Sequence, residues 1–470
     1  MNKTMNVKIP VIGPWSFYKT ALKIAVPIML QLLIQSLISL IDNFMVSGLG
    51  DAKMGAVNVA NQLNMIIFVL FNSICSAGGI FISQYNGIKD SEGMKQAYRF
   101  KIIVCVLIGF VYMLVSLFLS EYLLVFMLKG NKNEIAIMEQ GVKYARIIAF
   151  TWIPIAISTA IGSSMRESEN VKTPLMVSVI ATLVNTIFNW LLIYGNLGFP
   201  RMEVEGAAVA TLIARVVEMG SYIVYCKIKK PLFYSRWRNI LKVKFALFTS
   251  IMRKSLFVIV AEMSWIITET IMNKFYNGRG GSEVVAGMAS AWAVANLFQL
   301  VITGISISTS VLIGGTLGRG ELEYAKKQAR WMKSGAIISG CFVALLEIAS
   351  TGLLQLIFFK LSPEAISISR NMLIIISLYI PLWNLLNAQF ATARAGGDAL
   401  MGTVVDVTVN TFLFLPGILI IGLCTQLGPV AMFGILKLTD LVKTTIAEWQ
   451  LRKERWVKNL TVNTQEAQKI

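Results

Sequence analysis

The stretch PIMLQLLIQSLISLIDNFMVSGLG, from Pro27 to Gly50, is long and apolar enough to cross a membrane, and it carries one acid, Asp42. Gln31, Gln35 and Asp42 fall on one stripe of the predicted helix, because spacings of four and seven residues return to nearly the same face. A carboxylate at membrane depth costs about 2.5–3.5 kcal/mol, so it faces a cavity or a partner. The stretch therefore predicts a membrane helix whose polar face lines an ion or substrate path.

The composition of the whole chain is that of a polytopic membrane protein. Of the 470 residues, 56% are hydrophobic and 14% are charged, whereas soluble proteins carry about 25% charged residues. The net charge is +18, but the basic residues lie between apolar runs, so they indicate topology and not nucleic-acid binding. The chain has no His, and its five Cys form no CxxC pair, which argues against a histidine-based enzyme, a zinc site and a disulfide framework.

Twelve apolar runs are predicted to span the membrane. They cover about residues 20–46, 56–83, 102–120, 142–164, 173–194, 206–226, 256–276, 286–314, 335–358, 371–392, 400–421 and 430–450. Loops after even-numbered spans are basic, as in the first of them with Lys89, Lys95, Arg99 and Lys101, and loops after odd-numbered spans are sparse or balanced in charge. The positive-inside rule then predicts that both termini are cytoplasmic. The expected location is the plasma membrane, which is the inner membrane of a bacterium.

The second half of the chain repeats the first. QYNGIKDSEGMKQAYRF, Gln84–Phe100, aligns without gaps with GTLGRGELEYAKKQARW, Gly315–Trp331. Each half has six predicted spans, an even number, so both enter the membrane from the same side. The predicted fold is an all-α polytopic membrane protein, with 12 transmembrane helices in two parallel six-helix repeats.

The domain boundaries follow from the repeat and from a basic segment between the halves. RWRNILKVKFALF, Arg236–Phe248, alternates basic and apolar residues and is predicted to lie on the anionic inner leaflet. We expect an N-lobe at 1–230 with a cytoplasmic N-terminal segment, a linker at 231–255, a C-lobe at 256–455 and a cytoplasmic tail at 456–470. A cavity between the lobes is the expected substrate site, and rocking of the lobes gives alternating access.

The same register pairs Asp42 with Asn273 and Gln31 with Glu262. Each lobe thus has one amide and one acid at equivalent positions, in opposite order. Asp42 is the predicted cation or proton site, with a helix cap near the outer surface as the alternative. Glu262 is a predicted cavity acid, with a place at the inner membrane interface as the alternative.

Further candidate residues each have a structural role as the alternative. Asn185 and Asn189 stand four residues apart on the fifth span and suit Na⁺ coordination, or else ordinary bonding between helices. Asp406 lies inside the eleventh span and either lines the cavity or pairs with Arg394. The remaining candidates are Thr211, which heads a stripe with Arg215 and Glu218, the lesser acids Glu269 and Glu347, and the cavity aromatics Trp265 and Trp292.

No nucleotide motif accompanies the glycine pairs Gly78-Gly79, Gly314-Gly315 and Gly396-Gly397, which predict close helix packing. No cofactor is expected. The energy for transport must then come from an ion gradient, with Na⁺ or H⁺ as the coupling ion, or from the substrate itself.

Several motifs together resemble the multidrug and toxic compound extrusion (MATE) family. They are the stretch from Pro27 through IDNFMVSGLG, ISQYNGIKDSEGMKQA, VNTIFNWLLIYGNLGFP, GAAVATLIARVVE, VLIGGTLGRGELEYAKKQA and ARAGGDAL. The resemblance implies two six-helix bundles forming a V, which export amphipathic, often cationic compounds by Na⁺ or H⁺ antiport.

The resemblance also implies a cation site in the N-lobe. Asp42, Asn185 and Thr211 match the family's Asp, Asn and Thr, whereas Asn189 replaces a second Asp. If Na⁺ is the ion, these four residues are its ligands. Glu262 matches a seventh-helix Glu of some members, and a tenth-helix acid of others is absent between Asn371 and Thr392.

The predicted function is a cation-coupled antiporter for small amphipathic, cationic organic compounds. We expect a monomer that contacts membrane lipids and binds no nucleic acid. The alternative is a lipid-linked oligosaccharide or polysaccharide flippase of the same superfamily, which would need a cavity lined by Arg or Lys. Basic residues here are concentrated between the apolar runs, which favours the antiporter.

Overall fold

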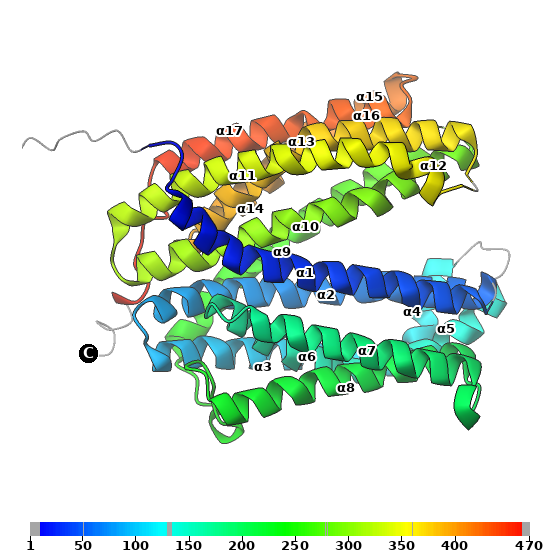
Figure 1. Cartoon of the computed structure of the whole chain (residues 1–470), viewed down its shortest axis with the longest axis horizontal. Coiled ribbons are helices and arrows are strands. Elements are labelled where there is room, and N and C mark those ends of the chain that lie inside the picture. Colours follow the sequence, from blue (N-terminus) through cyan, green and yellow to red (C-terminus); the bar gives the residue numbers. More distant parts are fainter. Residues whose placement is uncertain are drawn as a thin grey trace, which may run out of the picture. The chain divides into compact units, whose positions relative to one another are not determined.

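The computed structural model of the chain describes residues 10–49, 51–128, 134–277, 279, 281–359 and 361–462. All regular structure in this part of the chain is helical (Figure 1). The beginning of the predicted N-terminal segment, residues 1–9, and the end of the predicted tail, from residue 463 onward, lie outside the described residues.

Eleven helices in the described part are long and apolar enough to cross a membrane. Eight of them are single uninterrupted helices: α1 (Trp15–Ser47), α2 (Asp51–Gly87), α3 (Ser91–Phe118), α7 (Lys172–Tyr194), α8 (Glu203–Lys229), α9 (Phe245–Asn277), α10 (Ser282–Gly318) and α13 (Pro363–Ala395). The other three join shorter pieces: α5 (Glu134–Ile148), η1 (Ala149–Thr151) and α6 (Trp152–Glu167); α11 (Leu322–Ser350), η4 (Thr351–Leu353) and α12 (Leu354–Ile357); and α14 (Ala399–Val409), η5 (Asn410–Phe414) and α15 (Leu415–Cys424).

The twelfth predicted span is present as two short helices. It consists of α16 (Pro429–Lys437) and α17 (Thr439–Arg452), which are separated by Leu438. The remaining short helices are α4 (Ser120–Leu128), η2 (Asn196–Gly198) and η3 (Trp237–Asn239). Figure 1 shows α2, α3, α6, α7 and α8 running lengthwise beside one another.

The chain divides into two compact units. The first unit is Leu30–Ser255, and the second unit is the chain from Leu256 onward together with the chain up to Met29. The boundary near the beginning falls inside α1, two residues after Pro27. In the first unit α2 packs against α3, α5 and α6, and α7 packs against α8; in the second, α10 packs against α11 and α13.

The predicted repeat is visible in the helix bounds. Asp51 and Ser282, which begin α2 and α10, are 231 residues apart, and so are Gly87 and Gly318, which end them. Ser91 and Leu322, which begin α3 and α11, have the same separation of 231. The offset that aligns Gln84 with Gly315 in the sequence therefore also aligns the helices.

The predicted linker is partly helical and is held by α3. α9 begins at Phe245, inside the segment expected to be linker. Arg99 Nη1 donates to the carbonyl oxygen of Lys242 over 2.7 Å, and Arg99 Nε donates to Ser235 Oγ over 3.0 Å. Arg99 is therefore a structural anchor for the connection, in addition to any part in membrane topology.

Lys101 was predicted to lie in a basic loop, and this was wrong. It lies inside α3 with a side chain that is 0% exposed, and it forms an ion pair with Glu167 of α6. Its Nζ also donates to Ser163 Oγ over 3.2 Å. In an apolar interior each charge of such a pair compensates the other, and removal of either one would leave an unpaired buried charge.

The glycine pair Gly78-Gly79 gives this ion pair its space. A Cβ added at Gly79 would lie 2.0 Å from Glu167 Oε1, and one at Gly78 would lie 2.8 Å from the Lys101 side chain. Both distances are too short for real Cβ contacts. The close packing predicted from these glycines is thus packing of α2 against a buried ion pair.

We expect Gly79→Ala to destabilise the protein by about 1–3 kcal/mol, because the added methyl group displaces the Glu167 carboxylate from its lysine. Thermal unfolding of the purified protein in detergent measures the effect. Gly220→Ala in α8 is the matched control, since a Cβ there has nothing within 4 Å. Equal unfolding temperatures for the two variants would contradict this account of Gly79.

Candidate functional site

The residues predicted to bind a cation lie together in the first unit. Asp42 of α1 accepts a hydrogen bond from Asn189 of α7, with 2.6 Å between Oδ1 and Nδ2. The end of the Asn185 amide lies 2.9 Å from both Asp42 oxygens, and it donates to them when its nitrogen is placed on that side. The amide of Asn185 also lies 3.5 Å from Thr211 Oγ1 of α8. Two helices, α7 and α8, thus supply neutral polar groups next to the carboxylate of α1.

This cluster contains an oxygen that lacks a donor. Asn189 is buried, and its Oδ1 has no hydrogen-bond partner in the described part of the chain. Thr211 Oγ1 donates to the carbonyl oxygen of Ala207 over 2.9 Å, which leaves its lone pairs available. Carboxylate, amide and hydroxyl oxygens are the ligands that hard cations prefer, and the same free oxygen can accept a hydrogen bond from a protonated Asp42.

Arg215 is the basic residue of α8 that acts on Asp42. It interacts electrostatically with the carboxylate, but its ion pair is with Glu218, at 2.8 Å. The stripe that Thr211 heads thus contains a local ion pair between Arg215 and Glu218. Asp42 itself is held by amides and forms no ion pair among the described residues, so its charge is only partly compensated.

The two glutamines predicted on the stripe of Asp42 lie in the same unit. Gln31 is buried, whereas Gln35 is exposed and donates to Ser178 Oγ of α7 over 3.1 Å. Ser178 precedes Asn185 by two helical turns, so Gln35 is placed further toward the beginning of α7 than the Asp42 cluster is.

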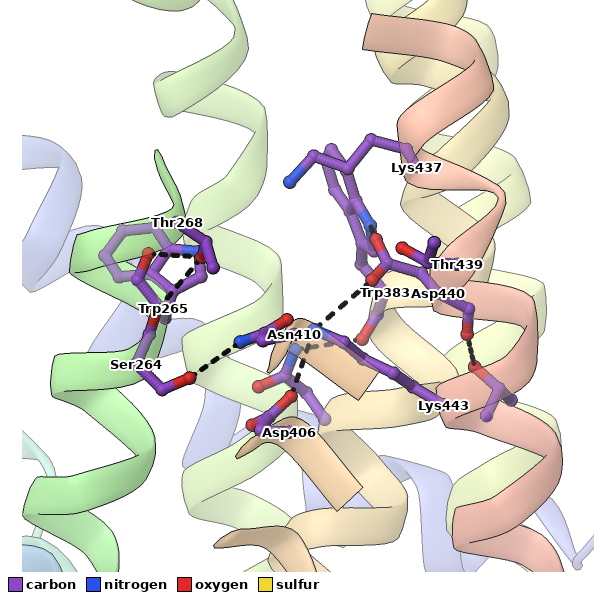
Figure 2. A network of polar contacts seen from close by, with 12 residues as sticks. Ser264, Trp265, Thr268, Trp383, Asp406, Asn410, Lys437, Thr439, Asp440 and Lys443 are labelled. Atoms are coloured by element: carbon purple, nitrogen blue, oxygen red, sulfur yellow. Dashed lines mark hydrogen bonds and ion pairs between the residues drawn. The ribbon is translucent and has the colours of Figure 1, made fainter. Parts of the chain in front are cut away.

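The second unit contains a network of charges in which Asp406 was a predicted candidate but Asp440 and Lys443 were not. Figure 2 shows Lys443 of α17 between two carboxylates, with its Nζ 3.2 Å from Asp406 Oδ1 and 3.5 Å from Asp440 Oδ1. Trp383 Nε1 donates to the other oxygen of Asp440 over 2.9 Å. The alternative that Asp406 pairs directly with Arg394 is thus replaced by a pair with Lys443.

A second lysine lies one helical turn from Asp440, at the end of α16. Lys437 Nζ is 2.5 Å from Glu269 Oε1 of α9. The same nitrogen lies 5.8 Å from the ring centre of Trp383, 5.3 Å from that of Phe414 and 5.5 Å from that of Phe433. Only 9% of the Lys437 side chain is exposed. We call Glu269 and these three rings the aromatic box.

Irregular backbone surrounds this network. Phe414 and Asn410 belong to the π-helix η5, and Asn410 Nδ2 donates to Ser264 Oγ of α9 over 3.1 Å. Trp383 follows Pro381, the proline inside α13, and the break at Leu438 directly follows Lys437. Interrupted helices and π-helical turns are frequent at functional sites in membrane proteins, and here one of each, the break at Leu438 and the π-helix η5, lies beside the same side chains.

The other predicted residues of the second unit are more dispersed. Glu262 interacts electrostatically with Arg394 and Asp406, which places it with the charged network. Trp292 packs edge-on against Phe433, with 5.9 Å between ring centres, so it contacts the aromatic box through this ring. Trp265 is 46% exposed, beside Ser264, and Asn273 is exposed near the end of α9. Asn273, the repeat partner of Asp42, forms no hydrogen bond or ion pair with the network in the described part of the chain.

A sequence model of the MatE family matches residues 27–191 and 258–419, which together make up more than half of the chain. The chain belongs to this family. The two matched ranges lie one in each repeat, and they include Asp42, Asn185, Asn189, Glu262, Glu269, Asp406 and Phe414. They do not include Lys437, Asp440 or Lys443.

Relatives of this MATE protein include proteins named for drug resistance. The probable multidrug resistance protein YoeA of Bacillus subtilis is 26% identical over 398 residues, which cover 81% of this chain and 82% of the relative. The probable multidrug resistance protein NorM of Thermotoga maritima is 23% identical over 377 residues, covering 77% and 76%. The chain is thus a membrane transporter of the multidrug efflux family.

Solved structures share the fold. An outward-facing multidrug resistance MATE transporter of the MOP superfamily superposes with a TM-score of 0.82 at 20% identity, over 97% of this chain and 98% of that one. A MOP superfamily transporter from Pyrococcus furiosus, described by a reverse polarity of its binding pocket, has a TM-score of 0.82 at 18% identity, over 97% and 100%. The fold of twelve transmembrane helices in two bundles is the one predicted from the repeat.

Proposed function

We propose that this MATE protein is an antiporter that uses an inward gradient of Na⁺ or H⁺ to export small amphipathic organic cations by alternating access. In this proposal it is a monomer in the plasma membrane, the inner membrane of a bacterium, with both termini cytoplasmic. The observation that carries the proposal is the Asp42 cluster, a partly compensated carboxylate held by Asn185 and Asn189 beside an oxygen without a donor.

The coupling step in this proposal is neutralisation of Asp42. A buried carboxylate in an apolar bundle is costly, and binding of a cation or proton removes that cost. The hydrogen bonds from the two amides are then weaker, because they are no longer made to a charged acceptor. α1 is free to repack against α7, and the two lobes exchange between inward and outward access. A membrane potential contributes about 2.3 kcal/mol per charge per 100 mV toward cation entry.

The charge of the second unit supports cationic and not anionic substrates. A flippase for lipid-linked saccharides would need basic groups free to bind pyrophosphate. Lys437 and Lys443 are buried, contrary to the expectation that basic residues stay in loops, but Glu269, Asp406 and Asp440 compensate them. These two lysines therefore do not form a positively charged pocket that could bind pyrophosphate.

The experiment that tests the proposed function is ethidium transport by purified protein in proteoliposomes. Na⁺ and H⁺ gradients are imposed separately, and each is collapsed with a matching ionophore as control. We expect one of the gradients to drive ethidium movement and its collapse to stop it. Ethidium movement that does not depend on either gradient would overturn cation coupling. If ethidium moves under neither the Na⁺ nor the H⁺ gradient, the proposed substrate class is overturned.

We expect Glu262→Gln to reduce this transport less than Asp42→Asn does. Glu262 interacts with Arg394 and Asp406, so its neutralisation redistributes charge within a network that already contains bases. Initial rates of ethidium transport in the same proteoliposomes, measured across external pH, compare the two variants. A larger loss with Glu262→Gln would move the coupling site into the second unit.

A further inference from the structure

The aromatic box has the composition of a binding site for an organic cation. A carboxylate and three aromatic rings around one ammonium group are the features by which proteins bind alkylammonium ligands. In this chain the ammonium belongs to Lys437, whose Nζ lies 2.5 Å from Glu269 and 5.3–5.8 Å from the three ring centres. The protein therefore supplies its own cation to the box.

The repeat shows how the box differs from the Asp42 cluster. Gly206–Glu218 aligns without gaps with Gly428–Asp440, at a separation of 222 residues instead of the 231 found for α2 and α10, so that Lys437 takes the position of Arg215 and Asp440 that of Glu218. In the first unit Arg215 pairs with Glu218 on its own helix and leaves Asp42 to the amides. In the second unit Lys437 reaches across to Glu269 on α9, the helix that corresponds to α1.

The same alignment places an aromatic ring where the first unit has a hydroxyl. Phe433 takes the position of Thr211, one helical turn before the basic residue. An oxygen that suits a small hard cation is thus replaced by a ring face that suits an alkylammonium group. The two units share an arrangement of helices but offer different chemistry to a cation.

Within the box the carboxylate is more exposed than two of the rings. Glu269 is 17% exposed, whereas Phe414 and Phe433 are only 3% and 0% exposed. Trp383 is fixed by its hydrogen bond to Asp440 and by stacking of Tyr379, 6.1 Å away between ring centres. A cation that arrived at Glu269 would meet rings already held in place.

We propose that Glu269, Trp383, Phe414 and Phe433 form an alkylammonium site that Lys437 occupies, and that cationic substrates bind there in competition with Lys437. The substrate class rests on the proposed function, but the site itself is tested by binding alone. An internal competitor weakens substrate binding and lets the site return to a filled state after the substrate leaves.

The test is calorimetric titration of the full-length protein in detergent with benzyltrimethylammonium. We expect Lys437→Ala to lower the Kd at least about tenfold relative to wild type, because the box no longer holds its own cation. Lys437→Arg keeps a charge in the box and is expected to give no gain. Adding Glu269→Gln to Lys437→Ala is expected to remove the gain. Lys333→Ala, which breaks another lysine–glutamate pair of the same unit, with Glu448 at 2.7 Å, is the matched control.

A Lys437→Ser variant replaces the alanine variant if the latter does not fold, since a serine hydroxyl can bond to the carbonyl one turn earlier. Binding that is no tighter than wild type in the folded variant, or a gain that survives Glu269→Gln, would overturn the proposal. Tight binding without gradient-driven export would keep the site and reject the proposed function. Gradient-driven export without any effect of Lys437 on binding would keep the proposed function and reject the site.

Discussion

Efflux of ethidium is expected to fall to the level of cells without the transporter when Asp42 is replaced by Asn, while the protein still folds and reaches the membrane. Asparagine has nearly the same shape and still accepts the hydrogen bond from Asn189, so the packing of α1 against α7 is retained. What is lost is the carboxylate charge that a cation or proton would neutralise. Because Asn189 stands where a second acid would be, the cluster has no other carboxylate to take over.

Whole-cell ethidium efflux, normalised to the amount of protein in the membrane, measures this loss. Asp90→Asn is the matched control, since Asp90 caps the beginning of α3 and asparagine caps a helix about equally well. The control should retain full efflux. Undiminished efflux with Asp42→Asn would remove Asp42 from the mechanism, and equal losses in both variants would point to a general defect.

The second large effect is expected from Lys101→Met, which should prevent accumulation of folded protein. Lys101 is fully buried and paired with Glu167, and removal of one partner leaves the other charge in an apolar interior. Loss of one partner of such a pair costs about 3–5 kcal/mol. Adding Glu167→Gln should restore much of the stability, because the orphaned charge is then gone.

Yield of folded protein and its unfolding temperature in detergent measure this prediction. Lys143→Met is the control, because Lys143 and Glu139 form an exposed pair at 3.0 Å that water already solvates. A double variant no better than Lys101→Met would show that the loss comes from packing and not from the unpaired charge.

The architecture of the chain could be predicted because two signals in the sequence are strong and regular. Runs of apolar residues mark the spans, and the match of Gln84–Phe100 with Gly315–Trp331 reveals the repeat that the bounds of α2 and α10 confirm. The helix breaks were not predicted. Leu438 and the π-helix η5 lie within stretches that were each predicted as one continuous span.

The Asp42 cluster was also predictable, since an acid inside a membrane helix is rare and its partners carry amides at helical spacing. The buried lysines were missed for the opposite reason. Lys101 stands at the edge of an apolar run, so it was assigned to a loop, and Lys437 was absorbed into a span without a role. The signal that could have found the second network is the spacing of Lys437, Asp440 and Lys443, which recur every three residues within an apolar run.

The equal separation of 231 residues between the bounds of α2 and α10 has a consequence for how such a chain can change over time. One residue inserted into either helix would turn every later side chain by about 100° around the axis, so that buried faces would meet lipid. Insertions are therefore excluded from these helices, whereas single substitutions leave the orientation of the other side chains intact. Substitutions can thus give the two halves of a duplicated transporter different side chains, with amides around an acid in one and rings around a lysine in the other. The corresponding helices α2 and α10 keep the same length.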